Sequence, residues 1–120
     1  MRRMSDDSSL PMEMVVGGRK YKILGFLFED EESVLGRTMI ERAVSMDANP
    51  GEEDGQHILD NYKDIPSVLH NTMFVITGWR KPGSADDVAC LCWKDNILVL
   101  AWLWIGGAHW SRGDRVLRRE

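Results

Sequence analysis

The sequence has few cysteines and no long hydrophobic run. Its two cysteines, Cys90 and Cys92, are too few for a disulfide framework. On a strand they would share one face with poor bridging geometry, so we expect reduced thiols and a cytoplasmic location. The longest apolar run, Ile97–Ile105, is about half of the roughly 20 residues that a spanning helix needs. The first ten residues lack the apolar core of a signal peptide, so neither secretion nor a membrane partner is expected.

An excess of positive charge is also absent. The formal net charge is −4 and the isoelectric point is about 5.4, whereas dedicated nucleic-acid binders carry a net basic surface. Acidic side chains gather between residues 29 and 64, while arginines gather after residue 111. A nucleic-acid partner is therefore not expected. The basic end of one chain could instead meet the acidic region of another copy.

The length of 120 residues is suited to one domain with an ordinary core. Residues 1–18 mix Ser, Asp, Met and Pro without a period, so they predict a disordered N-terminal tail. Residues 19–120 predict a single α+β domain.

The first half of that domain predicts one strand and two helices. Tyr21–Phe28 is rich in β-forming residues. A stripe of apolar side chains at steps of three and four predicts a helix that ends near Met46, capped by Asp30 or Ser33. Residues 52–65 predict a second, less regular helix that stops before a proline.

Three strands are expected in the C-terminal half, at Thr72–Trp79, Val88–Trp93 and Ile97–Ile105. The dipeptide Asp95-Asn96 is suited to a two-residue turn between the last two. The expected cross-strand pairs are then Trp93 with Leu98, Leu91 with Leu100, Ala89 with Trp102, Cys92 with Val99 and Cys90 with Ala101.

The fold class that follows is α+β. We expect an antiparallel sheet of about four or five strands, in the order strand, helix, second helix, then three strands, packed on one main amphipathic helix. The sheet could stay open or curl into a half-barrel or cone. Its strand order is not determined by these patterns.

The last two strands form a hairpin whose two faces are both apolar, and antiparallel sheets usually leave one face to water. Each large apolar side chain left exposed forfeits roughly 1.5–3 kcal/mol, so both faces need a cover. The second helix could supply it, the sheet could curl around a pocket, or a second copy could stack on it. We expect a homodimer, with an apolar ligand pocket as a compatible addition.

Five tryptophans, an unusual number for this length, are the candidate ligand-binding residues, since rigid aromatic rings suit the wall of an apolar cavity. They are Trp79, Trp93, Trp102, Trp104 and Trp110. Packing within the core or a dimer interface is the alternative use for them.

The candidates for acid-base chemistry are His70 and His109, paired with Asp60 or Asp64. A helix would also bring Glu53, His57 and Asp60 to one face, but acidic neighbours are common in so acidic a segment. A single Cys-x-Cys pair without further ligands predicts no metal site. No phosphate-binding glycine motif occurs either, so no cofactor is expected.

These observations predict a small cytoplasmic binding or interaction protein that dimerises through its Trp-rich sheet and could hold a small apolar ligand. The alternative is a small cofactor-independent pocket enzyme, a hydrolase or isomerase, that uses a histidine-carboxylate pair.

Overall fold

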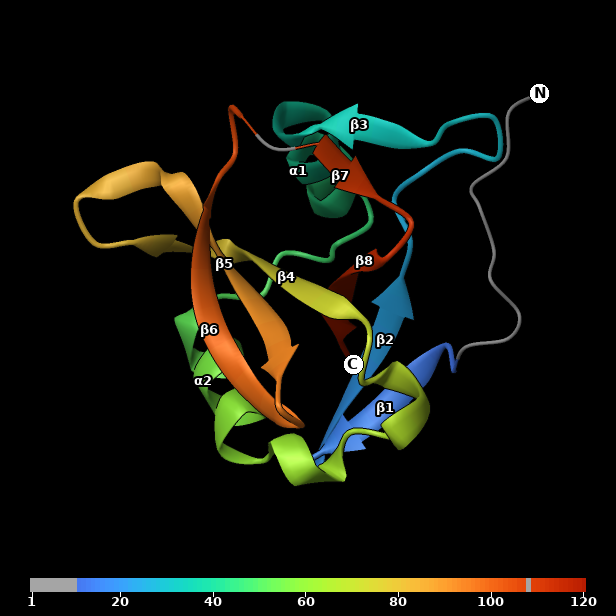
Figure 1. Cartoon of the computed structure of the whole chain (residues 1–120), viewed down its shortest axis with the longest axis vertical. Coiled ribbons are helices and arrows are strands. Elements are labelled where there is room, and N and C mark those ends of the chain that lie inside the picture. The colour runs from blue at the N-terminus through green and yellow to red at the C-terminus, as the bar shows by residue number, and fades with distance from the viewer. Residues whose placement is uncertain (1–10, 108) are drawn as a thin grey trace.

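The computed structural model describes residues 11–107 and 109–120, which form two sheets, two α-helices and two short 3-10 helices (Figure 1). The strands are β1 (Glu13–Val16), β2 (Arg19–Leu24), β3 (Ser33–Leu35), β4 (Met73–Lys81), β5 (Ser84–Lys94), β6 (Ile97–Trp104), β7 (His109–Ser111) and β8 (Asp114–Arg119). The helices are α1 (Gly36–Ser45), α2 (Glu52–Asp60), η1 (Tyr62–Asp64) and η2 (Ser67–Leu69). No helix of the described residues is both long and apolar enough to span a bilayer.

The large sheet has six strands in the order β1-β2-β8-β4-β5-β6, and β3 pairs with β7 in a separate ribbon. The fold is α+β as expected, but the predicted antiparallel sheet of four or five strands and the half-barrel or cone do not match it. The sheet is mixed, because β8 lies parallel to β4 and antiparallel to β2. Val116 and Leu117 of β8 are fully buried. The arginines around them concealed this central strand in the sequence.

Part of the predicted tail is a strand. Glu13–Val16 pair with β2 across a turn at Gly17-Gly18, and Met14 and Val16 are buried. The disordered assignment of residues 1–18 is therefore wrong for this segment, where alternate apolar residues enter the core. Residues 1–10 lie outside the described residues.

The start of α1 also differs from the expectation. Ser33–Leu35 form β3 against β7, and the cap position of α1 is Leu35, which makes no side-chain cap hydrogen bond. Neither Asp30 nor Ser33 caps the helix. The pairing of Val34 with Trp110 places both side chains in the core, a gain that outweighs capping by a nearby polar residue.

Two hydrophobic clusters lie on opposite faces of the sheet. The cluster on the α2 face includes Ile58, Leu69, Phe74, Ile76, Leu91 and Leu117. The cluster on the α1 face includes Phe26, Met39, Ala43, Val75, Cys90, Trp110 and Val116. The second predicted helix is confirmed as α2, so helical elements and the β3-β7 ribbon cover the central strands from both sides (Figure 1).

The β5-β6 hairpin has the predicted register. All five expected pairs occur, including Trp93 with Leu98 and Ala89 with Trp102. Asp95 and Asn96 have φ values of 53° and 64°, as a two-residue turn with both residues left-handed requires. The turn dipeptide and the apolar alternation together were enough to fix this part of the fold.

α2 packs closely on β4 at Gly55. A Cβ atom placed on Gly55 would lie 2.5 Å from Cε3 of Trp79 and 3.3 Å from Cγ2 of Ile76. Glycine costs helix stability relative to alanine, but here it lets the helix backbone rest on the Trp79 ring. The close approach seats α2 on its face of the sheet.

We expect Gly55→Ala to lower the free energy of unfolding by about 1–3 kcal/mol, because the added methyl group overpacks the Trp79 contact. Helix propensity alone predicts the opposite sign. Gly113→Ala is the control, since a Cβ there meets nothing within 4 Å. Chemical denaturation of both variants checks this, and a Gly55→Ala protein as stable as the parent would contradict the contact.

Candidate functional site

β6 forms one edge of the large sheet, with β5 as its single neighbour there. Its sequence from Ile97 to Trp104 contains only apolar residues. Ile97 is 50% exposed, Trp104 is 62% exposed, and all positions between them except Leu98 are half-buried. An apolar strand of eight residues is therefore left partly open on both faces.

The hydrogen-bonding groups of this edge can be assigned from the ladder. Ile105 N donates to Asp86 O at 2.8 Å, one step beyond the Asp87–Trp104 pair in the same register. Bonded and non-bonded positions alternate in an antiparallel ladder, so the odd-numbered residues of β6 bond to β5. The even-numbered residues, Leu98, Leu100, Trp102 and Trp104, direct their N–H and C=O groups away from the sheet.

The opposite edge, β1, is protected in ways that β6 is not. β1 has four residues and follows Pro11, and Glu13 pairs with Lys20 on β2 at 3.2 Å. Short length, proline and charge are the usual means of blocking edge-to-edge association. β6 has none of these, which makes it the candidate interaction surface of the molecule.

The five tryptophans do not form one site. Trp79 and Trp102 are in edge-to-face contact at 5.5 Å on the α2 face, whereas Trp110 is buried in the cluster on the α1 face. Trp104 is exposed and its ring lies against Gly106 and Gly107. The tryptophans are divided between core packing, the edge strand and, for Trp93, the wall of a pocket.

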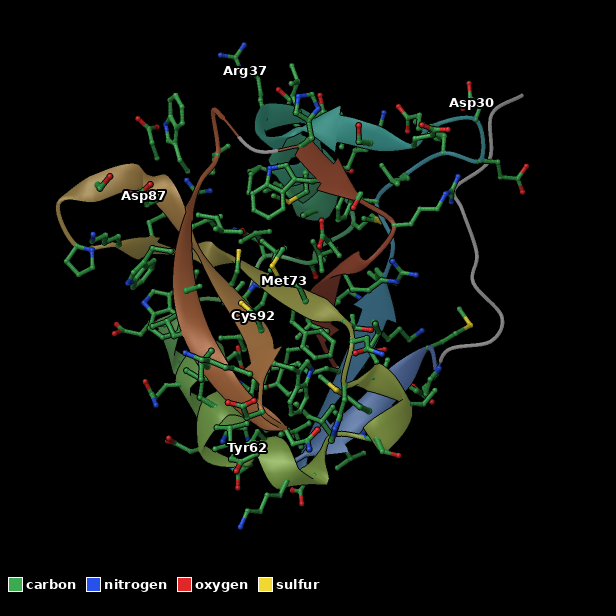
Figure 2. The ribbon with its side chains drawn as sticks, in the orientation of Figure 1. Asp30, Arg37, Tyr62, Met73, Asp87 and Cys92 are labelled. Carbon is green, nitrogen blue, oxygen red and sulfur yellow. The ribbon has the colours of Figure 1, made fainter. Side chains whose placement is uncertain are left out.

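Trp93 lines a pocket of about 400 Å³. The pairing of β4 with β5 begins at Phe74 and Leu91. The pocket lies just before this point in β4, beside Thr72 and Met73. Met73 on β4 and Cys92 on β5, both labelled in Figure 2, line this pocket. The full lining is His70, Asn71, Thr72, Met73, Cys92, Trp93, Asp95 and Asn96.

The aromatic wall of this pocket is ordered by ring contacts. The His70 ring stacks on Trp93 with centroids 4.0 Å apart, and Tyr62 meets Trp93 edge-on at 6.2 Å. Trp93 Nε1 is buried and has no hydrogen-bond acceptor among the residues that the structure describes. A buried donor left unpaired costs about 1–3 kcal/mol, so the unpaired indole N–H of Trp93 destabilises this part of the fold.

The predicted catalytic residues are not brought together. Asp64 accepts a hydrogen bond from Gly17 N at 2.8 Å, and Asp60 accepts one from Gln56 at 2.9 Å. Within residues 11–107 and 109–120, no hydrogen bond or ion pair joins either carboxylate to His70 or His109. In the described part of the chain, the four candidate residues therefore form no hydrogen-bonded histidine-carboxylate pair.

The cysteines are free thiols on β5. Burial raises the pKa of Cys92, and the nearby charge of Asp114 raises it further. Burial likewise raises the pKa of Cys90. Both thiols are therefore protonated at neutral pH, a poor state for a nucleophile or a metal ligand. No group of three or more metal-binding side chains occurs in the described part of the chain.

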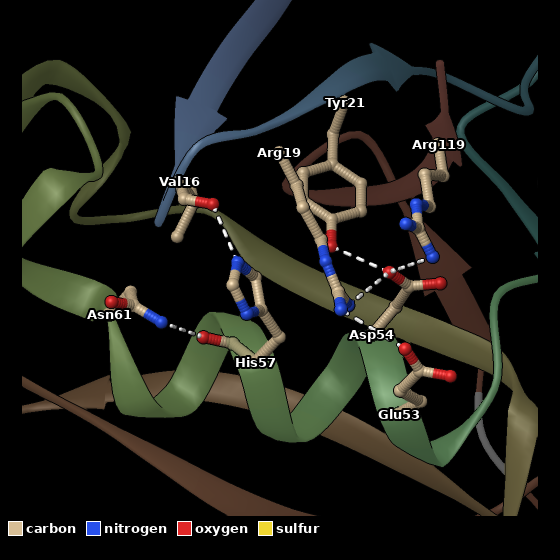
Figure 3. Close-up of polar contacts among 8 residues, drawn as sticks. All are labelled: Val16, Arg19, Tyr21, Glu53, Asp54, His57, Asn61 and Arg119. Carbon is tan, nitrogen blue, oxygen red and sulfur yellow. Dashed lines mark hydrogen bonds and ion pairs between the residues drawn. The ribbon is translucent and has the colours of Figure 1, made fainter.

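A partly buried polar cluster surrounds Asp54 of α2 (Figure 3). Asp54 Oδ1 accepts a hydrogen bond from Tyr21 OH at 2.7 Å and one from Arg19 at 3.2 Å, and Arg119 lies 3.5 Å away. Glu53 pairs with Arg19 at 3.0 Å. Since Asp54 is 8% exposed and its Oδ1 contacts side chains from both strands, the cluster fastens α2 to β2 and β8.

The set of Glu53, His57 and Asp60 on α2 is divided among separate contacts. His57 Nε2 is 2.9 Å from Val16 O at the end of β1, while Glu53 is bound to Arg19. All three residues lie on one helix, as the spacing predicted, but each side chain has its own structural partner.

No family model, no curated protein and no solved structure matches this chain.

The sequence analysis missed two groups of residues. The pocket residues Asn71, Thr72 and Asn96 come from two loops that are far apart in the sequence, so no spacing linked them. Asp54, Tyr21 and Arg119 are likewise brought together only by the sheet order. The polar Asn71-Thr72 step and the Asp95-Asn96 turn were visible, but they indicated only where strands begin and end.

The Asp54 cluster predicts an unusual tyrosine titration. Burial, and then the bond to Asp54, raise the pKa of Tyr21 to about 12. An unfolded tyrosine titrates near 10, so the stability from this phenol is complete below about pH 10 and is lost as the pH rises to 12. Phenolate absorbance, with Tyr21→Phe to identify the signal, measures the titration.

We expect Asp54→Asn to lower the pKa of Tyr21 while leaving it above 10, because burial remains. The same change should reduce the free energy of unfolding by about 1.5–3 kcal/mol. Glu53→Gln is the control, since Glu53 contacts Arg19 and is exposed. A Tyr21 pKa unchanged by Asp54→Asn would rule out the assigned bond.

Proposed function

We propose that this chain is an interaction protein that assembles as a homodimer by antiparallel pairing of β6 with β6 of a second copy. The observation that carries the proposal is an uncharged edge strand of eight residues, of which the four even-numbered ones direct their backbone N–H and C=O groups away from the sheet. The pairing would join two six-stranded sheets into one.

A second copy is the partner that fits this edge best. Both faces of β6 are apolar and half-exposed, so the added strand must also be apolar on both faces over a similar length. β6 itself meets this requirement. Antiparallel pairing of identical strands also gives a closed twofold assembly, the commonest form of homo-oligomer.

The symmetry restricts the register. A twofold axis perpendicular to the sheet keeps each residue on the same face, so even-numbered residues must pair with even-numbered ones. These are the residues whose backbone groups point outward. Pairing centred on Leu100 would place Leu98 of one copy opposite Trp102 of the other. In each such pair, the backbone N–H of one residue would donate to the C=O of the other, in both directions.

Burial of side chains adds to these hydrogen bonds. Complete transfer of a large apolar side chain from water contributes about 1.5–3 kcal/mol. In the single chain this transfer is incomplete for four side chains of β6 that stay partly exposed: Ile97, Leu100, Leu103 and Trp104. Pairing therefore stabilises the edge through contacts as well as through the extended ladder.

The thiols are consistent with a reducing compartment. Cys90 and Cys92 are free, and burial keeps both protonated. We include a cytoplasmic location in the proposal on this basis.

The proposal predicts that a lysine in the centre of β6 abolishes dimerisation. Ala101→Lys adds a charge on the edge without removing a large packed side chain. We expect the solution mass by light scattering to fall from about twice 13.7 kDa to 13.7 kDa, with the circular dichroism spectrum unchanged.

Val15→Lys is the matched control, because it adds the same charge to an exposed position of the other edge strand, β1. This variant should remain dimeric. The proposal fails if the parent protein is monomeric throughout the micromolar range, or if both lysine variants change the mass equally.

A further inference from the structure

The pocket beside Trp93 combines a defined volume with polar side chains that form no hydrogen bond or ion pair with the residues that the structure describes. Its volume of about 400 Å³ lies within the usual range of roughly 300–1,000 Å³ for small-molecule sites. The pocket does not involve the outer edge of β6, so its role is independent of the proposed dimer.

Five polar side chains face this space: His70, Asn71, Thr72, Asp95 and Asn96. None of these side chains makes a hydrogen bond or ion pair within residues 11–107 and 109–120. Polar side chains elsewhere, such as Asp54 and Thr77, are bonded to their neighbours. Unused donors and acceptors are thus concentrated at one place in the fold.

The charge of the lining selects the class of ligand. The pocket has one carboxylate, from Asp95, and neither lysine nor arginine. A phosphate or carboxylate ligand would meet no cationic side chain there and would be repelled by Asp95. The pocket is therefore suited to a molecule without negative charge.

The chemistry of the lining groups favours hydroxyl-bearing ligands. Carboxamides, an imidazole and a hydroxyl each donate and accept hydrogen bonds, and a sugar hydroxyl does both. One face of Trp93 is occupied by the His70 ring, and Tyr62 meets it edge-on. Trp93 therefore cannot hold a nucleobase between two rings, although its edge remains at the pocket wall.

We propose that this pocket binds a neutral saccharide of one or two rings, held by Asn71, Thr72, Asp95 and Asn96 against the Trp93–His70 wall. Thr72 is the most informative residue, because it is 6% exposed and directly precedes β4.

The test is a two-dimensional amide spectrum of the full chain during titration with glucose, galactose, mannose, maltose and lactose. The Trp93 Nε1–H signal is assigned by its loss in Trp93→Phe. We expect at least one of these sugars to shift this signal and the Asp95-Asn96 amides in a saturable manner. No saturable shift with any of the five would overturn the proposal.

Thr72→Val removes the hydroxyl and keeps the shape of the side chain. We expect it to weaken the binding of the active sugar roughly three- to tenfold, the change expected for one neutral hydrogen bond. Thr38→Val on α1 is the matched control and should bind like the parent. Equal affinity in Thr72→Val and the parent would show that the sugar binds elsewhere.

Two further ligands test the class. Glucose 6-phosphate should bind no tighter than glucose, and adenosine should leave the Trp93 signal in place. Tighter binding of the phosphate would overturn the neutral assignment. A saturable shift with adenosine alone would overturn the saccharide assignment.

Discussion

Covering both faces of the β4-β5-β6 ribbon is the constraint on which the rest of the structure depends. Cys90 and Leu91 are adjacent on β5, point to opposite faces and are both fully buried. α2 with η2 covers one face, while α1 with the β3-β7 ribbon covers the other. The contact of Gly55 with Trp79 and the Asp54 cluster both serve this layering, because each fixes α2 against the sheet.

The cover is complete over the centre of the sheet and incomplete at its edge. Burial falls from β5 to β6, where most of the apolar side chains are only half-buried. The same alternation that places Leu98, Leu100 and Trp102 beside the α2 cluster also turns their backbone groups outward. Apolar surface and unpaired backbone therefore occur on the same residues, and this coincidence is the basis for the proposed dimer.

The polar groups follow a similar division. Around Asp54, carboxylate, phenol and guanidinium groups satisfy one another and hold elements together. Around Trp93, polar side chains line a pocket without such partners. Polar groups with a structural role can thus be distinguished from those available to a ligand by whether they form hydrogen bonds within the chain.

The sequence by itself determined the local structure: the β5-β6 register from Asp95-Asn96 and its alternation, α1 from its apolar spacing, and the α+β class from both. Only the tertiary structure decided that β8 enters the middle of the sheet, that Glu13–Val16 and Ser33–Leu35 become strands, and which loops share a pocket. The physical reason is the distance along the chain over which each interaction acts. Turn geometry and side-chain periodicity act between neighbours in the sequence, whereas strand order and pocket composition depend on which distant apolar faces bury each other best.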